Sequence, residues 1–234
     1  MTTLTVLPEN YAIALKLIDE AHAQDPNTTP GPDGGPIPYE LHYAQEMTRW
    51  LAIHTPDASP ALQLACRAQH FRRWELPRSS YPKTRSGYLM WRAKAKSLAA
   101  QHLTTLLSSP AITPPIPESE IEYIASLVRK EGLRATSTKP RDSIETAPSQ
   151  QEIDAQAVED VACLVFLTQQ FESYSTTGNG AAIDDDKWVN ILRKTWAKMG
   201  ERGRELALGV VEALGERGKR LVVRAVSGDE KGEN

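Results

Sequence analysis

The sequence predicts an all-α fold, a single-domain bundle of about seven to eight helices. Apolar residues recur at spacings of three and four along most of the chain, which is the period of a helix with one buried face. No convincing alternation at period two indicates a strand. Clusters of Pro, Gly and Ser separate the periodic segments and are typical of helix ends. We expect one domain over residues 1–226 and a disordered tail over residues 227–234.

The first half of the chain predicts four helices. The first runs from Tyr11 to Ala23 behind an Asn10 N-cap, and Pro26 ends it because proline disfavours helical geometry in the preceding residue. Residues 26–38 are rich in Pro and Gly and predict an irregular loop. The other three helices are expected over Tyr39–His54, Ala61–Glu75 and Arg85–Leu107.

The second half begins with a proline-rich connector and a fifth helix over Glu118–Glu131. Residues 133–152 have almost no large apolar side chains and predict a mobile surface insertion. The next helix, Ile153–Tyr174, contains the most apolar run of the chain and is expected in the core. A loop over Ser175–Ala182 and two helices over Asp184–Met199 and Arg202–Val226 complete the predicted fold.

Composition narrows the class of protein. No stretch approaches ~18 uninterrupted apolar residues, so we expect no membrane span. The first residues lack the basic and apolar regions of a secretory signal, and the cytoplasm is the expected location. Cys66 and Cys163 lie within apolar helical patterns, which favours buried free thiols in a reducing compartment.

Positive charge is concentrated in residues 67–96, which we call the basic strip. It holds nine basic residues against one acid, Glu75, whereas 18 basic and 29 acidic residues lie elsewhere. A mildly acidic protein with one basic segment indicates a local binding site for an anion.

Helical spacing divides the basic strip into two faces. His70, Arg73 and Trp74 share one face of the third predicted helix, and Trp91 and Arg92 share a face of the fourth with Tyr88. The short connection makes these helices neighbours, so their arginines are expected to converge on one pocket. Guanidinium groups bind phosphate or carboxylate in pairs of hydrogen bonds, and aromatic rings offer stacking surfaces. The candidate ligand-binding residues are Gln69, Arg72, Arg73, Trp74, Arg78, Tyr81, Arg85, Tyr88, Trp91 and Arg92. The alternative is a solvated basic face whose aromatic side chains pack inward.

His70 is the candidate general acid or base, because its unperturbed pKa lies near neutrality. Asp160 or Glu75 would be its orienting carboxylate. The alternatives are a core histidine at position 70 and a structural ion pair for Asp160. If a divalent metal is bound, His70 and Asp160 are its candidate ligands. A divalent metal stays an open alternative. No nucleotide-cofactor motif is present, and the cofactor is left unassigned.

Several segments together resemble one family. The segments begin with Ile18-Asp-Glu-Ala-His-Ala-Gln-Asp-Pro and Gln69-His-Phe-Arg-Arg-Trp-Glu-Leu-Pro-Arg, and the others are Ser80-Tyr-Pro, Gly87-Tyr-Leu-x-Trp-Arg, Glu159-Asp-Val-Ala-Cys-Leu-Val-Phe-Leu and Leu192-Arg-Lys-Thr-Trp. On these the chain resembles the fungal and bacterial family called domain of unknown function 4202, which implies no established activity. Its members are often labelled glutamyl-tRNA synthetase. This chain lacks the His-x-Gly-His and Lys-Met-Ser-Lys-Ser signatures, so we expect no aminoacyl-tRNA synthetase.

A more distant similarity is to the HD phosphohydrolases, which are all-α metal enzymes. Ala61–His70 resembles the helix that ends in their His-Asp pair, and Asp160 resembles the distal aspartate. Here Gln69-His70 stands in place of His-Asp, and Tyr43 stands where the first histidine would be. The resemblance implies an HD-like bundle in which a divalent ion would lose most of its ligands.

These observations predict a protein that binds a small anionic ligand, with acid/base chemistry at His70 as a hydrolase or lyase. An RNA-binding module that uses the same strip, or a non-catalytic protein that docks a partner, remains an alternative. The sequence predicts no oligomeric state.

Overall fold

A computed structural model of the chain describes residues 3–133, 147–170 and 184–227. Its contacts form two compact units, one built from residues up to 133 with 150–158 and the other from residue 159 onward. The expectation of a single domain therefore stays a prediction. Most of the predicted insertion (134–146), the predicted loop over Ser175–Ala182 and residues 228–234 of the predicted tail lie outside the described residues.

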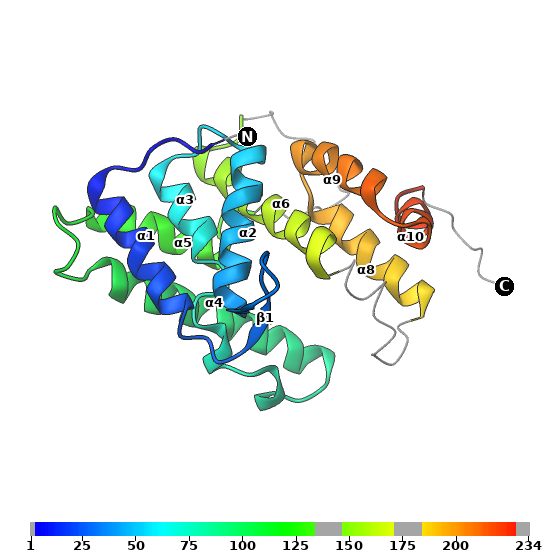
Figure 1. Cartoon of the computed structure of the whole chain (residues 1–234), viewed down its shortest axis with the longest axis horizontal. Helices are drawn as coiled ribbons and strands as arrows, with labels where there is room; N and C mark the ends of the chain where they lie inside the picture. Colours follow the sequence, from blue (N-terminus) through cyan, green and yellow to red (C-terminus); the bar gives the residue numbers. More distant parts are fainter. Residues whose placement is uncertain (1–2, 134–146, 171–183, 228–234) are drawn as a thin grey trace. The chain divides into compact units, whose positions relative to one another are not determined.

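The all-α class is confirmed (Figure 1). The first unit contains α1 (Glu9–His22), β1 (Thr28–Pro30), β2 (Pro36–Pro38), α2 (Tyr39–His54), α3 (Pro60–Arg67), the 3-10 turns η1 (Arg73–Glu75) and η2 (Arg78–Ser80), α4 (Arg85–Leu107), α5 (Glu118–Arg129) and the first part of α6 (Gln150–Val165). The second contains the end of α6, a π-helical turn η3 (Phe166–Gln170), α8 (Asp185–Lys198), α9 (Glu201–Ala213) and α10 (Glu216–Val226).

The described residues form nine α-helices, compared with the seven to eight predicted. The difference arises where one helix was expected over Arg202–Val226. There Leu214 takes an extended backbone and buries its side chain, and Gly215 is the N-cap residue of α10. The predicted insertion was also too long at its end, because residues 150–152 already belong to α6.

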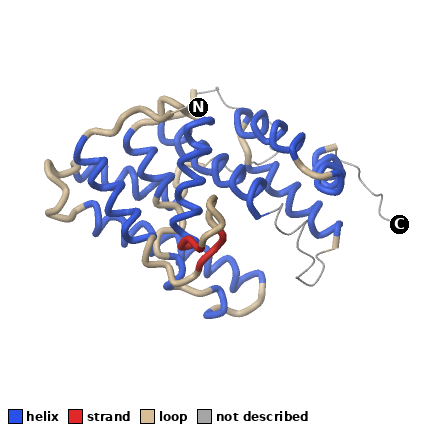
Figure 2. Tube along the Cα trace, viewed as in Figure 1, coloured by secondary structure: helices blue, strands red, loops and turns tan. Residues whose placement is uncertain are grey.

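The segment predicted as an irregular loop contains a short antiparallel hairpin, drawn red in Figure 2. Thr28 pairs with Pro38, Thr29 with Ile37 and Pro30 with Pro36. Gly34, in the turn, has φ +81°, which glycine adopts without steric cost. Strands of three residues with prolines at their ends are too short for alternation to be recognised, which is why the sequence did not predict them.

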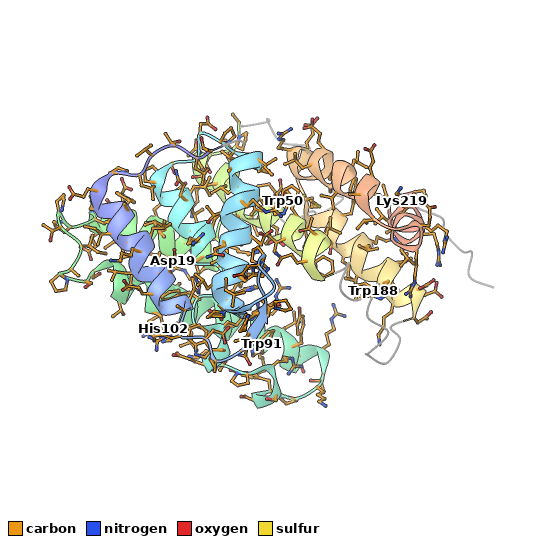
Figure 3. All side chains as sticks on the ribbon, viewed as in Figure 1. Asp19, Trp50, Trp91, His102, Trp188 and Lys219 are labelled. Carbon is orange, nitrogen blue, oxygen red and sulfur yellow. The ribbon has the colours of Figure 1, made fainter. Side chains whose placement is uncertain are left out.

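Helix α3 lies at the centre of the first unit. Every residue from Ala61 to Gln69 is buried, and α3 packs against α1, α2 and α5. Ser59 caps its first turn by accepting a hydrogen bond from the Leu62 N–H. At its last turn the buried Arg67 guanidinium donates two hydrogen bonds to Asp19 of α1, at 2.6 and 2.8 Å. Asp19 is labelled on α1 in Figure 3. The first arginine of the basic strip is therefore a structural residue that joins two helices.

Candidate functional site

The third predicted helix ends eight residues earlier than expected. It was expected to continue to Glu75, but α3 ends at Arg67 and the chain turns sharply over residues 68–76. His70 and Arg72 have left-handed backbones, with φ +63° and +53°. Non-glycine residues rarely take this conformation, which costs roughly 1–2 kcal/mol per residue. His70, Arg73 and Trp74 therefore do not share a helical face as the spacing predicted.

Two buried side chains from other helices explain the turn. His22 of α1 places its Nε2 3.0 Å from the Arg67 carbonyl oxygen, at the end of α3. Glu40 of α2 accepts hydrogen bonds through Oε1 from the backbone N–H groups of Arg73, at 2.6 Å, and Trp74, at 3.2 Å. These contacts satisfy backbone groups that a continuing helix would have satisfied internally.

His22 and Glu40 also contact each other, with Nδ1 and Oε2 3.3 Å apart. Because the Arg67 carbonyl can only accept, His22 carries a proton on Nε2. Burial raises the pKa of Glu40, and the hydrogen bond from His22 partly offsets that rise.

The turn forms one wall of a pocket of about 70 Å³. The other walls come from α4 and from the end of α5. The lining residues are Gln69, His70, Arg73, Arg92, Ala95, Lys96, Ala99, Val128 and Lys130. Four of them are cations, and none of these lining residues is an acid. The side chains that line the pocket therefore carry positive charge.

His70 lies in the pocket wall, and its ring stacks on the Tyr43 ring with centroids 4.4 Å apart. Within the described residues, neither ring nitrogen of His70 has a hydrogen-bond partner. Burial, reinforced by the positive charge of Arg73 and of Lys130, lowers the pKa of His70 well below its usual value. His70 is therefore neutral near pH 7.

Arg73 approaches the pocket from η1. Its guanidinium carbon lies 4.4 Å from the centre of the Trp91 ring, and the Trp91 Nε1 donates to the Leu76 carbonyl at 2.9 Å. Trp91 is thus a fixed platform beneath the arginine. Burial lowers the pKa of Arg73, although the group stays charged. No carboxylate among the described residues lies within ion-pair distance of Arg73 or of Arg92.

The structure brings together only part of the predicted ligand-binding set. Gln69, His70, Arg73 and Arg92 line the pocket, and Trp91 supports it from below. The other members are placed elsewhere in the strip and do not line the pocket: Arg72, Trp74, Arg78, Tyr81, Arg85 and Tyr88.

Three of these residues, Arg72, Arg78 and Tyr88, have contacts or exposure that place them outside the pocket lining. The Arg72 Nε donates to Glu75 at 2.8 Å, on the surface. Arg78 donates to the carbonyl groups of Tyr81 and Pro82, each at 2.8 Å, and so holds the connection before α4. Tyr88 is 42% exposed. Its ring centre lies 5.9 Å from the Arg92 guanidinium carbon. Tyr88 is therefore near a lining residue but does not line the pocket itself.

The two candidate orienting carboxylates have other partners. Glu75 pairs with Arg72 and lies 3.8 Å from His102. Asp160 belongs to the second unit, where its Oδ1 accepts the Gly200 N–H at 2.8 Å at the start of α9. Each therefore has a structural contact within its own unit. In the described ranges no three His, Cys, Asp or Glu side chains gather as a metal site requires.

Sequence reasoning missed four residues that shape the site. Lys96 and Lys130 line the pocket, Tyr43 supports His70, and Glu40 holds the turn. Lys96 lies four residues after Arg92 on α4, a spacing that would have placed it on the same face. Lys130 follows α5 and comes from a distant part of the chain, so no local pattern connects it to the basic strip.

A family model described as domain of unknown function (DUF4202) matches residues 12–222. The match includes the whole pocket, both side chains that hold its turn, and most of the second unit. No curated protein and no solved structure matches the chain, so the similarity to HD phosphohydrolases stays a prediction. None of the described helices has the length and apolar character to cross a membrane. The chain belongs to the DUF4202 family.

Proposed function

We propose that this protein binds a small anionic ligand, bearing a phosphate or carboxylate group, in the pocket of His70, Arg73, Arg92, Lys96 and Lys130. The observation that carries the proposal is the lining of the pocket, which combines four cations with no acidic side chain. Positive charges gathered in one pocket repel one another, and an anion among them relieves part of that repulsion.

The partial burial of Arg73 favours a small ligand over RNA. RNA-binding surfaces hold their basic side chains along an open groove, with aromatic rings free to stack on bases. Here Arg73 covers the ring of Trp91, and the Trp91 side chain is itself buried. The remaining chain is also acidic overall, which disfavours long contact with a polyanion.

His70 supports acid/base chemistry on the bound ligand, as in a hydrolase or lyase. It is neutral before the ligand arrives, has an available nitrogen, and adjoins the cations that would hold the anionic group. An imidazole in such a position can take up a proton and deliver it to the ligand, as a general acid/base does. Stacking on Tyr43, in place of a carboxylate, would orient the ring.

The test is a ligand screen on the full chain by thermal unfolding, with inorganic phosphate, acetate, nucleotides and sugar phosphates. A ligand at ten times its Kd stabilises the folded state by about 1.4 kcal/mol. Arg92→Gln should weaken binding by about tenfold or more, because it removes a charged hydrogen-bond donor.

The matched control is Lys94→Gln, which removes an exposed cation from the same helix outside the pocket. It should leave binding unchanged. The proposal is wrong if no anion stabilises the protein, or if the two substitutions weaken binding equally.

A further inference from the structure

The charge and the three-sided arrangement of the pocket distinguish between kinds of anion. We propose that the pocket selects a doubly charged tetrahedral oxyanion, such as the terminal group of a phosphate monoester, over a carboxylate, and that His70 takes up a proton and donates a hydrogen bond to it. This inference rests on the proposed function and specifies its ligand.

The positions of the cations favour a tetrahedral group. Arg73 comes from η1, Arg92 and Lys96 from α4, and Lys130 from the end of α5, so the donors approach from three elements. A carboxylate offers two oxygens in one plane, whereas a phosphate monoester offers three oxygens that point in different directions. Donors that come from three elements are better matched by three diverging oxygens than by two in one plane.

The amount of charge favours a dianion. The attraction between a cation and a ligand at a given distance is proportional to the charge of the ligand. A carboxylate offsets one positive charge of the pocket, and a dianion offsets two. Because Arg73 is partly buried, water screens its interaction with the ligand less than it would at the surface.

The charge of a bound dianion would also change the pKa of His70. The groups that face it are Arg73 from η1, Arg92 and Lys96 from α4, Lys130 after α5, His22 from α1 and the stacked Tyr43 from α2. In the empty pocket burial and the nearby cations lower the pKa of His70. A dianion beside the ring reverses that effect and raises the pKa of His70 toward its usual range. The imidazolium then donates from both nitrogens.

The first measurement compares anions of matched shape at constant ionic strength, by nuclear magnetic resonance titration of the full chain. Sulfate and methanesulfonate are both tetrahedral and differ in charge, and acetate represents carboxylates. Sulfate should bind about tenfold or more tightly than methanesulfonate or acetate, because of its second charge. Inorganic phosphate at about pH 8, where it is mainly dianionic, should follow sulfate.

The second measurement uses pH. Sulfate does not titrate near neutrality, so any pH dependence of its affinity comes from the protein. Proton uptake predicts that sulfate binds more tightly as pH falls, by up to about tenfold per pH unit between the pKa of His70 in the bound state and its lower pKa in the free state. The ring resonances of His70 should shift to those of an imidazolium on sulfate addition.

His70→Asn is the matched variant, since asparagine accepts a left-handed backbone more readily than most residues. It should remove the pH dependence while the cations still bind sulfate. If no anion binds, the proposed function itself fails. If anions bind but acetate equals sulfate, the dianion selectivity is wrong. If sulfate affinity is independent of pH in the unaltered chain, His70 does not take up a proton.

Discussion

The two halves of the basic strip differ in what determines their backbone. Helix α4 has its signals nearby, with Thr84 accepting a hydrogen bond from the Gly87 N–H at its start and internal hydrogen bonds along its length. The segment from residue 68 to 76 makes local turn hydrogen bonds as well, but its backbone is also held by His22 and Glu40, which lie far away in sequence. The half that forms the turn of the pocket is therefore the half that local rules describe poorly.

The geometry of the site therefore depends on contacts between segments that are distant in sequence. The left-handed residues His70 and Arg72 would relax in an isolated peptide, because each costs roughly 1–2 kcal/mol there. The buried carboxylate of Glu40 maintains them by accepting two backbone N–H groups. Substitutions can test each half separately.

The largest expected effect comes from Glu40→Ala. It removes the carboxylate that accepts from the Arg73 and Trp74 N–H groups, of which the Arg73 N–H keeps its bond to the His70 carbonyl, and leaves His22 without its carboxylate. We expect the free energy of unfolding to fall by about 3–5 kcal/mol, as when one partner of a buried pair is removed. Urea unfolding measures the change.

Two controls accompany that substitution. Gln45→Ala, at an exposed position of the same helix, should change stability by no more than about 0.5 kcal/mol. Glu40→Gln keeps an oxygen acceptor for the two N–H groups and should cost clearly less than Glu40→Ala. Equal losses for alanine and glutamine at position 40 would show that the carbonyl-type acceptor does not hold the turn.

A smaller effect is expected at Gly87, where the two halves of the strip meet. A Cβ at this position would lie 2.3 Å from the Pro82 carbonyl oxygen, so the connection before α4 would have to move. Gly87→Ala should destabilise the protein by about 1–3 kcal/mol, although alanine favours a helix.

Gly209 in α9 is the matched glycine, because a Cβ there meets nothing within 4 Å. Gly209→Ala should stabilise the protein by about 0.5–1 kcal/mol. Thermal unfolding of both variants gives the comparison. A stabilising Gly87→Ala would mean that the Pro82 backbone does not press on α4.

The smallest expected changes in stability have opposite signs in the two halves of the basic strip. Arg72→Gly relieves a left-handed backbone, which should raise the free energy of unfolding by about 1 kcal/mol. Loss of the surface ion pair with Glu75 offsets that gain by up to about 1 kcal/mol. Lys94→Gly, at an exposed position of α4, should destabilise by about 1 kcal/mol. Chemical unfolding of both variants measures the signs. Destabilisation by both would show that position 72 is not strained.

Local signals predicted much of the fold. The helices predicted at about Tyr39–His54 and Arg85–Leu107 have those bounds in the structure, because prolines or capping residues flank them. The hairpin and the break before Gly215 were missed, since each depends on pairing or side-chain burial that composition does not reveal. The end of α3 was wrong because Glu40 and His22 override the helical pattern.

The candidate site was predictable where charge and helical spacing sufficed. Arg92 faces the pocket because of its place on α4, and the basic strip around it was visible in the sequence. Gln69, His70 and Arg73 line the same pocket, but through a turn and not through the helical face on which the prediction relied. Lys130 and Glu40 became visible only when distant segments were brought together. Whether these residues bind a ligand stays a prediction.

The contact between His22 and the Arg67 carbonyl connects the pocket to a helix that lines none of it. Helix α1 ends at His22, and the Asp19 carboxylate of the same helix binds Arg67. His22 and Asp19 therefore tie the turn to the docked position of α1. If the pocket binds a ligand as proposed, the binding energy also stabilises the docking of α1, and the first helix contributes to recognition without contacting the ligand.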